Sequence, residues 1–163
     1  EYNKIYFGET EKKLEKICHE YLQGLQWVLT YYTKGCPSWN WYYAYQYAPF
    51  ASTLKKYIKT YKQKKYATTK PCLPFHQLLN VLPPRSANLL PEPLSNLLLQ
   101  NNNKNFPTDP KIDLSGKRKE WEGIVIVPMA DQKLINNFYK EHINMIDKKH
   151  EIKNILQTEK IYN

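Results

Sequence analysis

The sequence lacks several features that define common classes of protein. It has 163 residues, three cysteines and no long apolar run. Neither a secreted disulfide framework nor a membrane-spanning helix of about 20 residues is therefore indicated. The odd and sparse cysteines favour a reducing compartment, the nucleus or the cytoplasm. The chain begins without Met and without the apolar run of a signal peptide, so we expect a piece of a longer protein.

Carboxylates are missing from a long part of the chain, because no Asp or Glu occurs between Tyr21 and Pro91. This stretch holds nine of the 24 cations of the chain. The rest of the chain holds 15 cations and 15 carboxylates, which cancel, so the net charge of +9 comes from this stretch alone. Its nine cations are Lys34, Lys55, Lys56, Lys59, Lys62, Lys64, Lys65, Lys70 and Arg85. Such a localised positive segment is typical of nucleic-acid binding, with a solvated lysine face as the alternative.

Motifs for catalysis and metal binding are also missing. There is no phosphate-binding GxxxxGK[ST] loop and no GxSxG elbow. Glu120 and Glu122 would point the same way on a strand, but such a pair is more typical of surface charge. Cys72 and His76 are four residues apart without a paired CxxC, which favours a buried thiol and a surface histidine over zinc. We expect no catalytic and no metal-binding residue in this chain.

Aromatic residues, in contrast, are concentrated in CPSWNWYYAYQYAPF, residues 36–50. Seven of its fifteen residues are Trp, Tyr or Phe: Trp39, Trp41, Tyr42, Tyr43, Tyr45, Tyr47 and Phe50. Flat rings beside cations are typical of single-stranded nucleic-acid binding, in which the rings stack on bases. We expect one or two rings to contact nucleic acid and Tyr42, Tyr43 and Phe50 to pack internally.

Periodicity predicts a mainly α fold of helices and long irregular loops, with at most a short strand near 121–127. Proline, glycine and capping residues set the expected boundaries. The expected helices are 11–33 with Thr10 as N-cap, a short one capped by Ser52, Phe75–Leu82, Leu94–Gln100, and a C-terminal segment capped by Asp131. Residues 63–70 and 100–110 are predicted to be flexible loops.

The first of these helices has a wide apolar stripe, which we expect to pack in a core. Its members are Leu14, Ile17, Cys18, Tyr21, Leu22, Leu25, Val28, Leu29 and Tyr32. Gly24 costs about 1 kcal/mol against Ala in mid-helix, which predicts a close neighbour there. Trp27 and Trp121 are also expected in the core.

Three blocks of sequence stand out, in order, over about residues 15–140. They are YLQGLQWVLTYYTKGCPSWNWYYAYQYAPFAS (Tyr21–Ser52), PFHQLLNVLPPRSANLLPEPLSNLL (Pro74–Leu98) and IDLSGKRKEWEGIVIVPMADQKLI (Ile112–Ile135). Together they resemble signature blocks of the XRN/Rat-type 5′→3′ exoribonucleases. In that family the blocks belong to the C-terminal part of the second conserved region, so residues 1–163 are expected to form a single fragment of a larger α/β nuclease.

The resemblance implies a parent enzyme that degrades 5′-monophosphorylated single-stranded RNA. The Mg²⁺ or Mn²⁺ ligands of the family belong to the first conserved region, which this chain does not contain. The fragment alone is therefore expected to be inactive and to narrow the RNA entrance while packing around that region. Its expected partners are single-stranded RNA and the catalytic region, with no membrane.

The resemblance also implies that a tryptophan from the SWNW block bounds the stacked bases, without choosing between Trp39 and Trp41. Together with the basic segment, it gives the candidate RNA contacts Trp39, Trp41, Tyr45, Gln46, Tyr47, Lys55, Lys56 and Arg85. The chain departs from the family where Ala44 and Gln46 replace its Pro and His, and where Thr53 replaces an acidic residue. Loss of the His puts any pH-dependent contact there in doubt.

Two alternatives stay open at the level of sequence. One is a stand-alone single-stranded RNA-binding module. The other is a structural piece, in which residues 39–50 are buried against the missing region and the lysine segment is a solvated linker.

Overall fold

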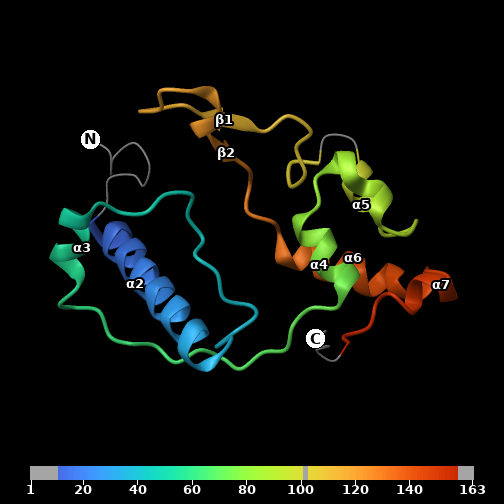
Figure 1. Ribbon diagram of the computed structural model, residues 1–163, viewed down its shortest axis with the longest axis horizontal. Coiled ribbons are helices and arrows are strands. Elements are labelled where there is room, and N and C mark those ends of the chain that lie inside the picture. Colours follow the sequence, from blue (N-terminus) through green and yellow to red (C-terminus); the bar gives the residue numbers. More distant parts are fainter. Residues whose placement is uncertain (1–10, 101–102, 158–163) are drawn as a thin grey trace, which may run out of the picture. The chain divides into compact units, whose positions relative to one another are not determined.

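A computed structural model describes residues 11–100 and 103–157, and its elements are mainly helical (Figure 1). The predicted mainly α fold class is thus confirmed. The chain divides into two compact units, which we call the N-terminal unit, ending at Pro71, and the C-terminal unit, starting at Cys72. The assignment of 1–163 as a single fragment of a larger nuclease stays a prediction.

The N-terminal unit is built on one long helix, α2, which covers Glu11–Lys34. Its acidic first residue and its basic last residue both suit the helix dipole. The helix ends because Gly35 adopts a left-handed backbone (φ 92°) and donates its N–H to the carbonyl of Tyr31 at 3.1 Å. The predicted range 11–33 is confirmed, while the predicted cap Thr10 lies outside the described residues.

The second helix of this unit, α3, covers Ala51–Tyr57 and starts earlier than predicted. Phe50 is its N-cap, with an extended backbone whose carbonyl accepts the N–H of Leu54 at 2.9 Å. The prediction that Ser52 caps this helix was wrong, because the first turn has already closed over it. No side-chain hydrogen bond caps α3.

In the C-terminal unit, short helices and turns alternate with irregular segments. The α-helices are α4 (Pro74–Val81), α5 (Asn96–Leu99), α6 (Gln132–His142) and α7 (Lys148–Glu151). The 3₁₀ turns are η1 (Pro84–Leu89), η2 (Glu120–Glu122) and η3 (Ile143–Met145). The predicted cap Asp131 is confirmed, since its Oδ1 accepts the backbone N–H groups of Lys133 and Leu134.

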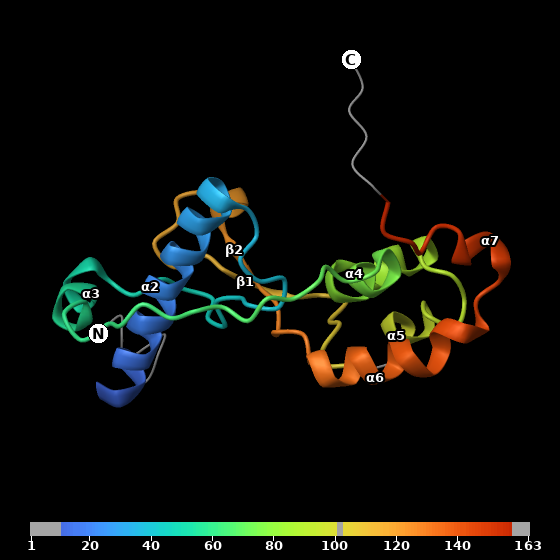
Figure 2. The ribbon, with the colours of Figure 1, turned by 90° about the horizontal axis from the view of Figure 1, so that it is seen from below.

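The core of the C-terminal unit lies between α4 and α6, which run side by side (Figure 2). Its buried members are Phe75, Leu79, Ala87, Leu90, Leu94, Leu97, Leu98, Phe106, Ile135, Tyr139 and Ile146. The buried amide of Asn154 joins its parts: Oδ1 accepts the N–H of Phe75 at 2.9 Å and Nδ2 donates to the Tyr139 hydroxyl at 2.7 Å. Both polar ends of this amide are thus satisfied away from water.

The only sheet in the described part of the chain has two antiparallel strands, β1 (Lys111–Asp113) and β2 (Ile124–Ile126). The short strand near 121–127 is confirmed at its C-terminal half. Trp121 lies instead in η2, where 77% of it is exposed, so its prediction as a core residue was wrong. Glu120 and Glu122 lie in this 3₁₀ turn and not on a strand, so the alternation that would put their side chains on one face of a strand does not apply to them.

The apolar stripe of α2 is buried only in its first half. Ile17 and Cys18 are fully buried, but Leu25, Val28, Leu29 and Tyr32 are exposed. The prediction that nearly the whole stripe packs in a core was therefore wrong. Periodicity identifies an apolar face, and burial depends on whether another segment covers it.

Candidate nucleic-acid interface

The aromatic run of residues 36–50 is extended and lies against one side of α2 (Figure 1). The indole Nε1 of Trp27 donates to the carbonyl of Ser38 at 3.0 Å. Further along, the Trp41 ring covers Gly24, where an added Cβ would lie 3.1 Å from the ring atom Cη2. The close neighbour predicted at Gly24 is thus confirmed, and it is a ring of the aromatic run.

A second extended segment, residues 61–70, is also held against α2 by hydrogen bonds. Gln26 Nε2 donates to the carbonyl of Lys64 at 2.8 Å, and the Tyr66 hydroxyl donates to the carbonyl of Gln23 at 2.5 Å. Burial, with a smaller contribution from Tyr61, raises the pKa of Tyr66 to about 12. Tyr66 therefore keeps its proton and its donor role at neutral pH. The mobility predicted for 63–70 stays a prediction.

The two extended segments meet at Thr69. Its Oγ1 accepts the backbone N–H of Trp39 at 2.7 Å and lies 3.4 Å from Oγ of the buried Ser38. Next to this contact the rings of Trp41 and Tyr66 pack edge to face, with centroids 5.8 Å apart. The backbone that carries Trp39 is therefore fixed by a residue from the other segment.

The two tryptophans that the resemblance left undecided differ in burial. Trp41 is half-buried between Gly24 and Tyr66. Trp39 leaves 53% of its surface exposed, and within the described residues its hydrogen bond to Thr69 is made by its backbone N–H. Trp39 is thus the more exposed of the two residues, and Trp41 is the one that packs on the helix.

The three remaining candidates of the run lie beyond Trp41. Tyr45 is half-buried against Tyr43, with ring centroids 5.2 Å apart. Burial and a hydrogen bond with Glu20 raise the pKa of the Tyr45 hydroxyl. The carbonyl of Tyr47 accepts the Tyr43 hydroxyl at 2.8 Å, and Gln46 is exposed. Most of this end of the run therefore packs, and Gln46 is its accessible polar side chain.

Tyr42 and Phe50, expected to pack internally, each leave about half of their surface exposed. Tyr43 does pack, with its ring edge-on to Tyr21 at 5.6 Å. Burial raises the pKa of the Tyr43 hydroxyl well above its usual range.

The predicted cations are not all available for phosphate. Lys56 Nζ lies 2.5 Å from Oε1 of Glu11, and Arg85 pairs with Asp109 at 3.2 Å in the C-terminal unit. Lys55 is exposed in α3 and makes no ion pair with another residue in the part of the chain that the structure describes. The pair with Lys56 lowers the pKa of Glu11 and raises that of the lysine. Arg85 belongs to the C-terminal unit, whereas the aromatic run belongs to the N-terminal unit.

Sequence reasoning missed Thr69, which positions Trp39, and Tyr31, which stacks on Trp27 with ring centroids 5.4 Å apart. The spacing i, i+4 could have indicated the ring pair. No local signal indicates Thr69, because its partner is 30 residues away in the sequence.

Side chains for other chemistry are not grouped in the described ranges. Residues 11–100 and 103–157 contain no cluster of three or more His, Cys, Asp or Glu side chains that could hold a metal ion. None of the helices described is long and apolar enough to cross a bilayer. The described elements form a mainly helical fold, with an aromatic run on an irregular segment and the excess of cations in residues 21–91.

Comparison with known proteins identifies the family to which this chain belongs. The family model described as the Xrn1 helical domain matches residues 2–163. The 5′-3′ exoribonuclease 2 of Schizosaccharomyces pombe is 43% identical over 132 residues, which cover 79% of this chain and 13% of that protein. The 5′-3′ exoribonuclease 1 of Saccharomyces cerevisiae is 33% identical over 165 residues, or 99% of this chain and 11% of that protein.

The human 5′-3′ exoribonuclease 1 is 45% identical over 116 residues, which cover 69% of this chain and 7% of that protein. The chain belongs to the XRN family of 5′→3′ exoribonucleases. It spans only 7–13% of the length of these three relatives.

Proposed function

We propose that this chain is part of a 5′→3′ exoribonuclease that degrades 5′-monophosphorylated single-stranded RNA, and that it forms one wall of the RNA entrance. The parent enzyme binds Mg²⁺ or Mn²⁺ through carboxylates outside this chain, acts in the nucleus or cytoplasm, and packs its catalytic region against this wall. The fragment alone is inactive.

The observation that carries the proposal is the exposed ring of Trp39 on a backbone fixed by Thr69. A base stacked on an aromatic ring is worth about 1–3 kcal/mol in single-strand binding. Cations of the acid-free segment supply the attraction for phosphate. Two of them, Lys64 and Lys70, lie in sequence on either side of Tyr66 and Thr69. This combination favours RNA contact over a purely structural role for the run.

The proposal predicts that Trp39→Ala weakens binding of a single-stranded oligouridine to the full chain by about tenfold. Fluorescence anisotropy of a labelled oligomer measures this, and wild-type affinity is expected to fall as salt rises. Trp39→Phe should keep most of the affinity, because it keeps a ring.

Trp121→Ala is the matched control, since it removes an exposed tryptophan of the C-terminal unit. Equal losses for Trp39→Ala and Trp121→Ala, or an affinity that does not depend on salt, would contradict the proposal. A parent sequence without clustered carboxylates upstream would favour the stand-alone RNA-binding module.

A further inference from the structure

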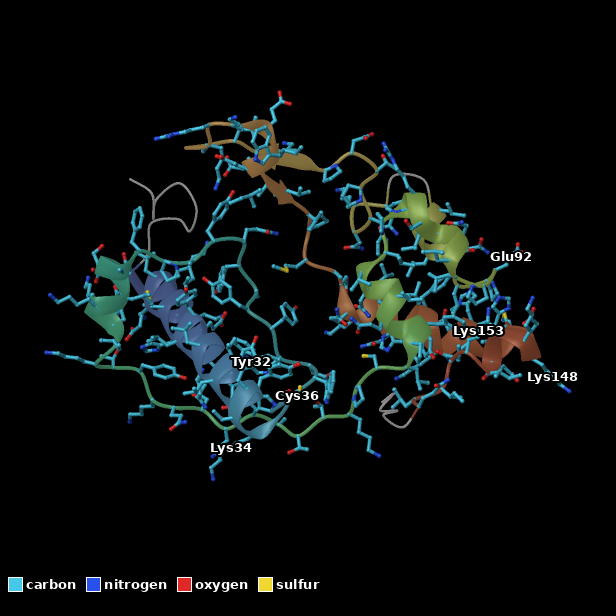
Figure 3. All side chains as sticks on the ribbon, viewed as in Figure 1. Tyr32, Lys34, Cys36, Glu92, Lys148 and Lys153 are labelled. Atoms are coloured by element: carbon cyan, nitrogen blue, oxygen red, sulfur yellow. The ribbon has the colours of Figure 1, made fainter. Side chains whose placement is uncertain are left out.

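The extended segment 61–70 has no helix or strand, and Figure 3 shows side chains standing out from the green ribbon that follows α3. Hydrogen bonds to α2 and to the aromatic run anchor the segment at Lys64, Tyr66 and Thr69. Thr68 lies between the last two of these anchors, and its side chain is exposed. The segment therefore presents the Thr68 hydroxyl on a backbone that is held on both sides.

Thr68 differs from the other serines and threonines of the acid-free segment, residues 21–91. Each of the others is buried, donates or accepts a side-chain hydrogen bond, or lies in a helix or 3₁₀ turn. They are Thr30, Thr33, Ser38, Ser52, Thr53, Thr60, Thr69 and Ser86. A protein kinase must bring an acceptor hydroxyl to the γ-phosphate of ATP, which favours an exposed side chain outside helices. Thr68 meets this condition, since no hydrogen bond to a described residue holds its hydroxyl.

The sequence around Thr68 is basic on both sides. Lys65 precedes it by three residues, Lys64 precedes it by four, and Lys70 follows it by two. All three lysines are exposed, and none forms an ion pair with another described residue. Kinases select their substrates by charge pattern, so cations on both sides of the acceptor suit a substrate groove that is lined by carboxylates.

We propose that Thr68 is phosphorylated by a protein kinase with an acidic substrate groove, and that the added phosphate weakens RNA binding by this chain. The Thr68 Oγ1 attacks the γ-phosphorus of ATP and forms the new O–P bond. The bond from that phosphorus to the β-phosphate oxygen breaks, ADP leaves, and the hydroxyl proton passes to the catalytic base of the kinase. The modification does not depend on the proposed function, whereas its effect on RNA binding rests on it.

The effect on RNA follows from charge. Phosphothreonine brings about −2 charges into a segment that contains no carboxylate. Lys65 and Lys70 lie within three residues of Thr68, so they can pair with its phosphate instead of with RNA phosphates. Neutralising two cations reduces the logarithmic salt slope of single-strand binding by about 1.4, which corresponds to roughly tenfold weaker binding near physiological salt.

The first test asks whether Thr68 accepts phosphate. The 163-residue chain and the parent enzyme are incubated with ATP, Mg²⁺ and the catalytic domain of protein kinase C, and mass spectrometry locates and counts the phosphopeptides. We expect Thr68 to react at least about tenfold faster than Ser52, the matched exposed hydroxyl in α3, because a helical acceptor must first unfold locally. Lys65→Gln should slow the reaction at Thr68, because it removes a cation that the groove recognises.

No phosphate on Thr68 in the chain or in the parent enzyme would overturn the proposal. Equal rates at Thr68 and Ser52 would overturn it as well, since the extended backbone and the flanking lysines would then give no selectivity.

The second test compares binding before and after modification. The chain phosphorylated at Thr68 should bind the labelled oligouridine about tenfold more weakly than the unmodified chain, with a flatter salt dependence. Its melting temperature should shift by about 2 °C or less, because the Thr68 side chain is exposed. Unchanged affinity, or weaker binding that comes with a large fall in melting temperature, would overturn the proposal. Thr68→Ala should keep the wild-type affinity after the same kinase treatment.

The two proposals fail separately. If Trp39→Ala binds the oligomer as tightly as the wild type, the stacking proposed for Trp39 fails, while the phosphopeptides still decide whether Thr68 is the acceptor.

Discussion

The two units bury their side chains by different means. In the C-terminal unit, eleven side chains from several short elements close into one apolar cluster. Among the described residues of the N-terminal unit, the buried apolar ones are Ile17, Cys18, Pro49 and Tyr57. Hydrogen bonds from Trp27, Gln26 and Tyr66 hold extended segments to α2.

The difference shows that apolar content alone does not decide where a core forms. Short helices such as α4 and α5 have little stability of their own and persist because tertiary packing buries their apolar sides. The long helix α2 has more local stability, so it can present an open apolar face without unfolding. We therefore expect the C-terminal unit to depend on single core side chains and the N-terminal unit to depend on contacts between segments.

The largest effect should come from Leu79→Ala in α4. Leu79 is fully buried, and truncation of a buried leucine costs about 2–5 kcal/mol through lost burial and the cavity left behind. Chemical unfolding measures the loss, and hydrogen exchange should place it in the C-terminal unit. Leu29→Ala, the same change at an exposed position of α2, should cost about 0.5 kcal/mol or less. Similar costs for the two variants would contradict the contrast between the units.

A smaller loss is expected for Trp41→Ala. The ring fills the space over Gly24 and packs edge-on to Tyr66, but it is only half-buried, so we expect a cost of about 2 kcal/mol. Thermal unfolding and the hydrogen-exchange protection of α2 measure it. Trp39→Ala should leave both nearly unchanged. If it destabilised the chain as much as Trp41→Ala, the division of roles between the two rings would be wrong.

The smallest effect concerns pH. Burial lowers the pKa of His76 below its ordinary 6.5, and a hydrogen bond with Asn136 opposes part of this shift. The unfolded chain then binds a proton more readily, so the C-terminal unit should lose stability as the pH falls below about 6.5. Urea unfolding at pH 7.5 and 5.5 measures the slope.

His76→Phe should flatten that slope while keeping a ring against Tyr139, on which His76 stacks with centroids 4.8 Å apart. Two other titratable groups of the C-terminal unit, Tyr139 and Asp147, change protonation outside the range between pH 5.5 and 7.5. Burial raises the pKa of Tyr139 above 10, and bonds from His150 hold that of Asp147 below 3.8. An unchanged slope in His76→Phe would show that another group is responsible.

Local sequence signals predicted the elements whose causes are local. Apolar periodicity and Gly35 defined α2, and Asp131 marked the start of α6 through bonds to its own first turn. The mainly α character followed from the same signals. Strand β1 was not predicted, because three residues with no alternating pattern form a strand only through their pairing with β2.

The candidate site was predictable in composition and not in arrangement. The aromatic run and the acid-free segment are visible in the sequence, but the choice between Trp39 and Trp41 depends on Gly24 and Thr69, which approach from other segments. The exposure of Trp121 has the same origin, since an apolar residue is buried only where another segment covers it.

The hydrogen bond between Thr69 and the backbone of Trp39 has a consequence for affinity. A flexible loop must give up conformational freedom when a ligand holds its ring, and this loss subtracts from the binding free energy. Here folding has already restricted the backbone on both sides of the contact. For the proposed stacking of a base on Trp39, Thr69 would therefore reduce the entropy lost on binding without touching the ligand itself.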